Sequence, residues 1–72
     1  MTKEEFLSEL TAIAGTTKKL SEETLLADIP EWDSLAAMST VSFFEEKLKK
    51  EIDMGTIEQM KTVSDLMKAA GL

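Results

Sequence analysis

Several residue types are missing from this chain of 72 residues, and each absence removes a class of chemistry. Cysteine is absent, so the chain has neither a disulfide framework nor a thiol nucleophile. Histidine is absent as well, which removes the usual general base and the commonest transition-metal ligand. No glycine-rich phosphate loop is present, and the carboxylates between Glu51 and Glu58 lack the spacing of a calcium loop. We therefore expect neither a catalytic site nor a metal site, and a protein that is not an enzyme.

Basic residues are few: eight lysines and no arginine stand against fourteen acidic residues, which gives a formal net charge of −6. This charge repels nucleic acid and anionic membranes and attracts basic protein surfaces, although solubility alone would also account for it. No apolar run approaches membrane-spanning length, and the chain starts with polar residues, so we expect a cytoplasmic monomer with no membrane partner. The length and a hydrophobic content of 43% predict one folded domain, residues 1–72.

Helical spacing of apolar residues predicts an all-α fold, a small four-helix bundle of three main helices and one short helix. The main helices are expected at about Lys3 to Ala14, at about Ser34 to Lys50, and between the cap residue Thr62 and the stop residue Gly71. The short helix is expected at Thr56 to Met60. A long first loop, Thr16 to Trp32, joins the first two helices, and Ser21 is expected to start a single helical turn in it.

The second helix should have one buried and one outward side. At 100° per residue, the core stripe comprises Ala37, Val41, Phe44 and Leu48, with Thr40 at its edge and Phe43 outside it, flanking the first helix. The outward side carries Leu35, Met38, Ser42, Glu45 and Glu46. We expect partner proteins to contact Leu35, Met38, Glu45 and Glu46. For Leu35 and Met38 the alternative is that they are half-buried residues at the rim of the core.

The stretch from Glu31 to Leu35, E-W-D-S-L, opens this helix after a loop closed by Pro30. Asp33 has the short acceptor side chain preferred at a helix N-cap, and Ser34 then occupies the first helical position. A phosphate esterified to Ser34 would lie where backbone N–H groups and the helix dipole both favour negative charge. An ordinary capped helix with an unmodified serine is the alternative.

The motif Asp33-Ser34-Leu35, at the start of a central helix in a small acidic chain, resembles the attachment motif of acyl carrier proteins. The resemblance covers nearly the whole chain. It implies a phosphopantetheine arm, derived from coenzyme A, on Ser34, with Asp33 and Leu35 completing the motif. The arm's thiol would shuttle acyl intermediates of fatty acid, polyketide or related biosynthesis as thioesters. The implied partners are a phosphopantetheinyl transferase, a loading enzyme, and downstream synthases or transferases with basic docking surfaces.

The chain departs from the carriers of bacterial fatty acid synthesis directly after the motif. Those carriers usually have more acidic residues where this chain has Ala36, Ala37 and Ser39, and only Glu45 and Glu46 match their later acidic pair. The preceding Glu31-Trp32 is similar to discrete carriers of specialised pathways. An aminoacyl or peptidyl carrier is an alternative with the same mechanism, and a non-carrier acidic helical adaptor that binds a basic partner is an alternative of another class.

Overall fold

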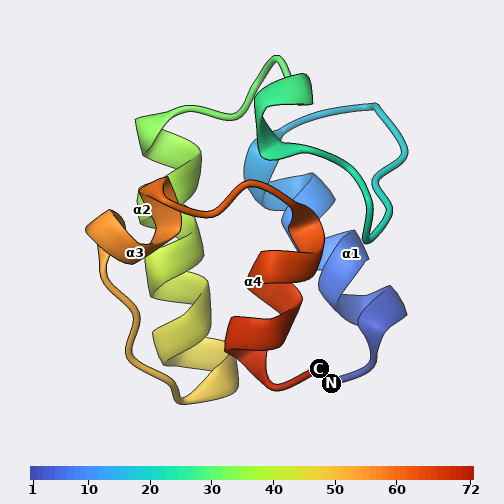
Figure 1. Ribbon diagram of the computed structural model, residues 1–72. Coiled ribbons are helices and arrows are strands. Elements are labelled where there is room, and N and C mark those ends of the chain that lie inside the picture. Colours follow the sequence, from blue (N-terminus) through green and yellow to red (C-terminus); the bar gives the residue numbers. More distant parts are fainter.

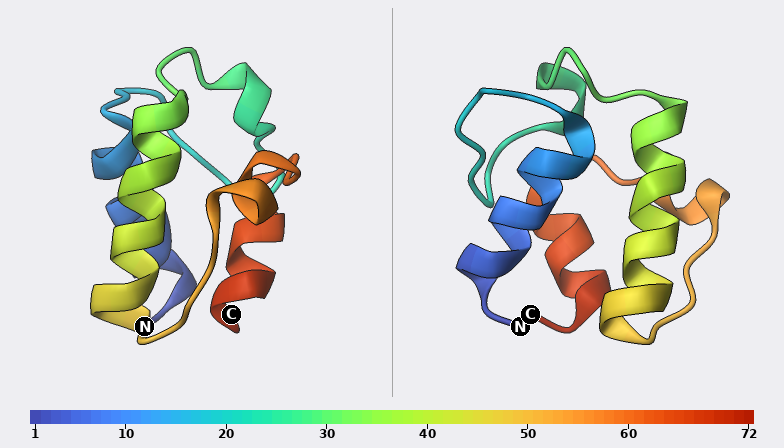
Figure 2. Two further views of the ribbon diagram at one scale, coloured as in Figure 1. Left: turned by 90° about the vertical axis from the view of Figure 1, so that its left-hand side faces the viewer. Right: turned by 180° about the vertical axis from the view of Figure 1, so that it is seen from behind.

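A computed structural model describes all residues, 1–72, and contains four α-helices and no strand. The helices are α1 (Lys3–Ala14), α2 (Ser34–Phe43), α3 (Met54–Glu58) and α4 (Val63–Ala70). Figures 1 and 2 show α1, α2 and α4 running alongside one another, with α3 beside α2 and the first loop arched over one end. The all-α bundle of three main helices and one short helix is therefore confirmed. Both termini lie at the end of the bundle opposite to the start of α2 (Figure 1).

Two helices begin and end where the sequence predicts, because local caps fix their ends. At the start of α1, Glu5 N donates to Thr2 Oγ1 (3.1 Å) and Thr2 N donates to Glu5 Oε1 (2.8 Å). The same reciprocal pair forms between Thr62 and Asp65 at the start of α4. Each helix then stops at a glycine with a positive φ: Gly15 (70°) after α1 and Gly71 (84°) after α4. Residues that carry a side chain are strained in this left-handed conformation.

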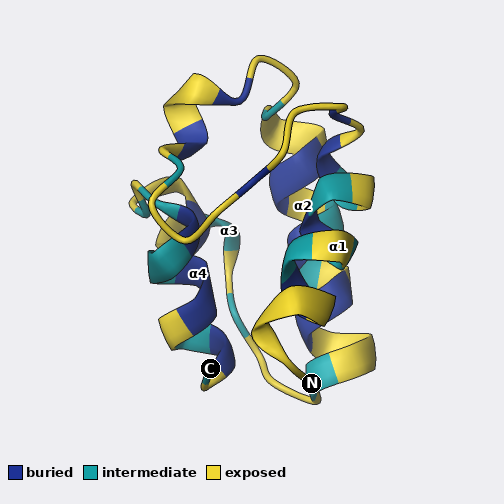
Figure 3. Ribbon diagram, turned by 90° about the vertical axis from the view of Figure 1, so that its right-hand side faces the viewer, coloured by how far each residue is buried: buried dark blue, intermediate teal, exposed yellow.

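Three phenylalanine rings form the centre of a core of 14 buried residues. Phe6 of α1 lies 5.8 Å from Phe43 and 6.3 Å from Phe44, between ring centroids, at tilted or edge-on angles. Phe43, which was predicted to lie off the stripe and to flank the first helix, contacts Phe6 of α1 and is buried there, with 6% of it exposed. Figure 3 shows the buried residues on the sides of α1, α2 and α4 that face the interior.

The predicted core stripe of α2 is correct for Ala37, Thr40 and Phe44, whereas Val41 and Leu48 pack against the core without being fully buried. For Leu48 the reason is a π-helical turn, Phe44–Leu48, which continues α2 with more residues per turn than the 100° spacing assumes. The hydroxyl of buried Thr40 donates to Ala36 O at 2.8 Å.

The end of the second helix was predicted at Lys50, two residues too late. Lys49 adopts a left-handed conformation (φ 56°), and the N–H groups of Lys49 and Lys50 both bond to the carbonyl of Phe44. The short third helix also differs, since α3 starts at Met54 and not at Thr56. Asp53 caps it by accepting from Thr56 N at 2.7 Å, so that Gly55 lies inside the first turn.

The first loop is fastened to the core and to α4. Leu20, Leu26 and Ile29 are buried, whereas Leu25 is exposed. At Ser21 the chain forms one hydrogen-bonded turn, in which Thr24 N donates to Ser21 O, and a 3₁₀ turn follows at Leu26–Asp28. The loop is therefore packed against the bundle along most of its length.

Candidate functional site

Ser34 is the first residue of α2 and is exposed to solvent. Asp33 precedes it in an extended conformation, and its Oδ1 accepts from Ala36 N at 2.9 Å, as a helix N-cap does. The carbonyl of Asp33 accepts from Ala37 N at 3.0 Å. The cap that the sequence predicts is therefore present, and it holds Ser34 within a complete first helical turn.

Two backbone N–H groups remain without a protein acceptor at this end of α2. They belong to Ser34 and Leu35, because Asp33 occupies those of Ala36 and Ala37. The Ser34 side chain also has no hydrogen-bond partner among the protein's own groups, so its hydroxyl faces solvent. An anion attached to this hydroxyl would lie near free N–H donors and the positive end of the helix dipole.

The segment that leads into Ser34 is anchored on both sides. Ile29 is buried, Trp32 packs half-buried against the core, and Trp32 N donates to Ile29 O at 3.0 Å. Further back, the loop bonds to the start of α4: Leu26 N to Lys61 O (2.8 Å), Val63 N to Thr24 O (3.0 Å) and Ser64 N to Glu22 O (2.9 Å). The last two bonds satisfy donors in the first turn of α4 that would otherwise lack partners. All three bonds fix the path of the chain before Ser34, and sequence reasoning missed them.

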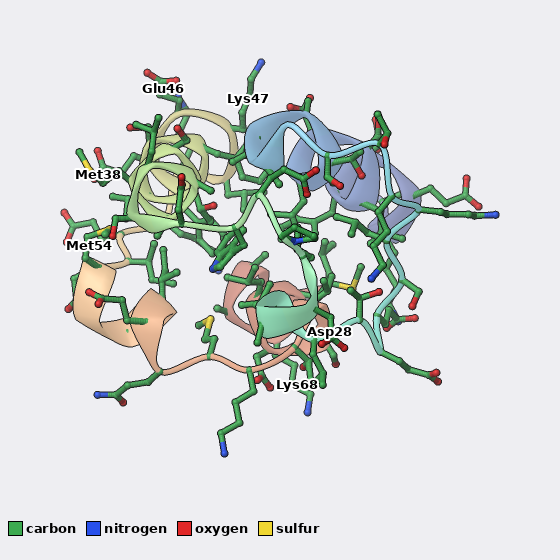
Figure 4. The ribbon with its side chains drawn as sticks, turned by 90° about the horizontal axis from the view of Figure 1, so that it is seen from above. Asp28, Met38, Glu46, Lys47, Met54 and Lys68 are labelled. Atoms are coloured by element: carbon green, nitrogen blue, oxygen red, sulfur yellow. The ribbon has the colours of Figure 1, made fainter.

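Leu35 and Met38 project into solvent beside Ser34. Leu35 is 68% exposed and Met38 is 55% exposed, so the alternative of half-buried rim residues is excluded for both. Met38 lies four residues after Ser34, which places it on the same face of the helix one turn further along. Figure 4 shows Met38 directed away from the bundle, on the same side of the molecule as Met54 of α3. On α2, the surface next to Ser34 therefore contains two exposed apolar side chains.

Glu45 and Glu46 are exposed, but they lie in the π-helical turn at the other end of the helix. Glu45 lies eleven positions after Ser34, which at about 1.5 Å per residue places it roughly 17 Å away along the axis. Glu46 and Lys47 project from another side of α2 than Met38 does (Figure 4). The structure thus brings together Asp33, Ser34, Leu35 and Met38, and it does not bring the acidic pair to them.

The resolved pKa shifts belong to helix caps outside this site. Hydrogen bonds from backbone N–H groups lower the pKa of three carboxyls below their ordinary values: Glu5 (bonded by Thr2), Asp53 (bonded by Thr56) and Asp65 (bonded by Lys61 and Thr62). The closest cation–carboxylate pair, Lys3 Nζ with Glu22 Oε1 at 3.3 Å, joins α1 to the loop at an exposed position. No group of three or more acidic, cysteine or histidine residues has the arrangement of a metal site.

Comparisons of the chain with protein-family models, with curated proteins and with solved structures found no match. None of the four helices combines the length and the apolar character that crossing a bilayer requires.

Proposed function

We propose that this protein is a carrier that bears phosphopantetheine as a phosphodiester on Ser34 and presents thioester-bound acyl groups to partner enzymes. The observation that carries the proposal is the position of Ser34: an exposed hydroxyl on the first residue of a capped helix, with no protein partner. The proposal also rests on the resemblance of Asp33-Ser34-Leu35, within a small acidic helical chain, to the attachment motif of acyl carrier proteins.

The residues around Ser34 fit such a group. The phosphodiester carries a negative charge, and the unpaired N–H groups of Ser34 and Leu35 are donors for its oxygens. Because Ser34 is exposed at the end of the bundle, a long arm can extend into solvent without displacing a core residue. When bound, the arm supplies the thiol that this cysteine-free chain lacks.

The chain's own residues position the hydroxyl and do not activate it. Asp33 holds the first turn through Ala36 N, and buried Ile29 with half-buried Trp32 holds the approach to it. Without histidine, the chain has no ordinary general base for the transfer. A phosphopantetheinyl transferase therefore supplies the base and the magnesium ion and directs Ser34 Oγ at coenzyme A.

Partner enzymes meet two kinds of surface on α2 and its π-helical continuation. Leu35 and Met38 offer apolar contact beside the arm, and Glu45 and Glu46 offer negative charge to basic docking surfaces further along. Buried apolar contact sets how long a complex lasts, whereas exposed charge sets how fast it forms. The cargo is an acyl group or, in an aminoacyl or peptidyl carrier, an amino acid on the same arm.

The test is to incubate the unmodified protein with coenzyme A and a broad-specificity phosphopantetheinyl transferase and to weigh the product. We expect the wild type to gain one phosphopantetheine and Ser34→Ala to gain none. Ser42→Ala is the matched control, because it removes another exposed hydroxyl from the outward side of the same helix and should be modified like the wild type.

If the wild type gains no mass, or if Ser34→Ala gains it equally, the carrier function is wrong. The acidic helical adaptor then becomes the better description, because an adaptor has no use for the Ser34 hydroxyl.

A further inference from the structure

The oxidisable sulfur of this chain lies entirely in its five methionines, because cysteine is absent. Their exposures differ widely. Met38 is 55% exposed and Met1 is 48% exposed, whereas Met67 is 1% exposed in the core. Met54 and Met60 are half-buried and packed against the core. Oxidation of a thioether follows its exposure, so a dissolved peroxide should reach Met38 and Met1 first.

Only one of these two exposed thioethers lies next to the candidate site. Met38 is on the face of α2 that carries Ser34, one helical turn further along, and it projects outward (Figure 4). Met1 lies at the opposite end of the bundle (Figure 1). Two thioethers of similar exposure therefore differ in their distance from Ser34, and Met1 serves as an internal control for effects that do not depend on position.

We propose that Met38 is a redox modification site, at which peroxide reversibly weakens the docking of enzymes that act on Ser34; this inference rests on the proposed carrier function. A sulfur lone pair of Met38 attacks one oxygen of hydrogen peroxide, the O–O bond breaks, and an S–O bond forms. The sulfur is oxidised by two electrons, and the other oxygen leaves as water after proton transfer. Methionine sulfoxide reductases reverse the change.

The sulfoxide changes the docking surface and leaves the fold intact. It places a strongly polar oxygen where the unmodified side chain offers a flexible apolar contact. Met38 does not belong to the buried core, so the core packing of Phe6, Phe43 and Phe44 is retained. Oxidation of Met67, by contrast, would place a polar group in the core and unfold the chain. Limited oxidation therefore separates docking from stability.

The first experiment measures the order of oxidation. The protein is treated with increasing hydrogen peroxide, digested, and each methionine peptide is weighed for added oxygen. We expect Met38 and Met1 to be oxidised well before Met54, Met60 and Met67, with the circular dichroism spectrum unchanged while only the first two have reacted. If Met38 reacts no faster than buried Met67, the proposal is overturned.

The second experiment measures the consequence as a ratio, the kcat/KM of the phosphopantetheinyl transferase for oxidised protein divided by that for reduced protein. For the wild type we expect this ratio to fall by about three- to tenfold, the size expected for losing one apolar contact. Treatment with methionine sulfoxide reductases should restore it. For Met38→Leu, which still carries Met1, the ratio should stay at one whatever the rate of its reduced form.

The outcomes separate this inference from the proposed function. If the reduced wild type is loaded and Met38 oxidation leaves the ratio at one, the redox site is wrong and the carrier function stands. A ratio that falls equally in Met38→Leu would also overturn the redox site. If the reduced wild type is not loaded at all, the carrier function fails and the inference fails with it.

Discussion

Removing the side chain that caps α2 tests how Ser34 is held. Asp33→Ala deletes the 2.9 Å hydrogen bond from Ala36 N and leaves that N–H without a protein acceptor, while the bond from Ala37 N to the Asp33 carbonyl remains. Loss of such a cap costs about 0.5–2 kcal/mol. A domain of this size is stable by about 4–11 kcal/mol, so the loss is a substantial share of the total. Each 1 kcal/mol lowers the Tm of a small domain by about 4–8 °C.

The assay is thermal unfolding followed by circular dichroism, together with hydrogen exchange of the Ala36 amide. Asp33→Asn keeps an acceptor oxygen and removes the charge, so its Tm should stay close to that of the wild type. The control is Glu31→Ala, which also removes one negative charge, from an exposed side chain two residues before Asp33 that caps no helix. This variant should change Tm little. Exchange at Ala36 should quicken in Asp33→Ala alone.

Two results would contradict this account of Asp33. One is an equal loss of Tm in Asp33→Ala and Glu31→Ala, which would assign the effect to charge. The other is an Asp33→Asn variant as unstable as Asp33→Ala, which would show that the oxygen acceptor is not what stabilises the first turn.

Three further predictions follow from the core, the caps and the docking surface. Phe44→Ala removes a fully buried ring and should lower the free energy of unfolding, measured with urea, by about 3–5 kcal/mol. The control Leu35→Ala, at an exposed position, should lower it by about 0.5 kcal/mol or less. An unchanged urea midpoint for Phe44→Ala would mean that the core is misassigned. The free energy of unfolding should fall on acidification, because three cap carboxyls have a lower pKa in the folded chain than in the unfolded chain. Their contribution to stability is complete above the ordinary pKa and is lost as the pH falls through the folded pKa. Urea unfolding between pH 7 and pH 2 measures this loss. The ordinary values are 4.5 for Glu5 and 3.8 for Asp53 and Asp65. Replacing both Glu45 and Glu46 by lysine should slow loading by a partner enzyme and flatten the salt dependence of the loading rate. Met38→Ala should instead weaken binding at every salt concentration. If the charge-reversed protein is loaded as fast as the wild type at low salt, the first loop becomes the better candidate for the acidic docking surface.

The features that could be predicted from the sequence are those that depend on residues close together in the chain. The caps of α1 and α4 depend on residues three positions apart, Thr2 with Glu5 and Thr62 with Asp65, and both were found where the pattern places them. The Asp33 cap, and with it the exposed position of Ser34, follows from the same kind of short-range rule. The all-α class follows from helical spacing that contacts elsewhere did not override.

What the sequence did not predict depends on contacts between distant segments. The π-helical turn widens α2 at Phe44, where Phe43 and Phe44 both turn into the core against Phe6, and no residue between Phe44 and Leu48 marks it as a helix break. The bonds between the first loop and α4 join backbone groups and leave no trace in side-chain identity. The short helix was predicted to start at Thr56, although the Asp53 cap starts α3 two residues earlier, at Met54.

Spacing along α2 decides how the two parts of the proposed docking surface are related. The net charge of −6 favours a basic partner, yet α2 has no acidic residue in its first turn, and the exposed groups nearest to Ser34 on its outward side are apolar. Its acidic pair lies roughly 17 Å away along the axis. At that separation, which exceeds the Debye length of about 8 Å at physiological ionic strength, salt largely screens the pair from charges beside the Ser34 hydroxyl. Under the proposed carrier function, attraction would bring a basic partner to the far end of the helix, and Leu35 and Met38 would supply the apolar contact beside Ser34. The proposal therefore predicts a partner surface divided in the same way, with basic residues opposite Glu45 and Glu46 and an apolar patch where it reaches the serine.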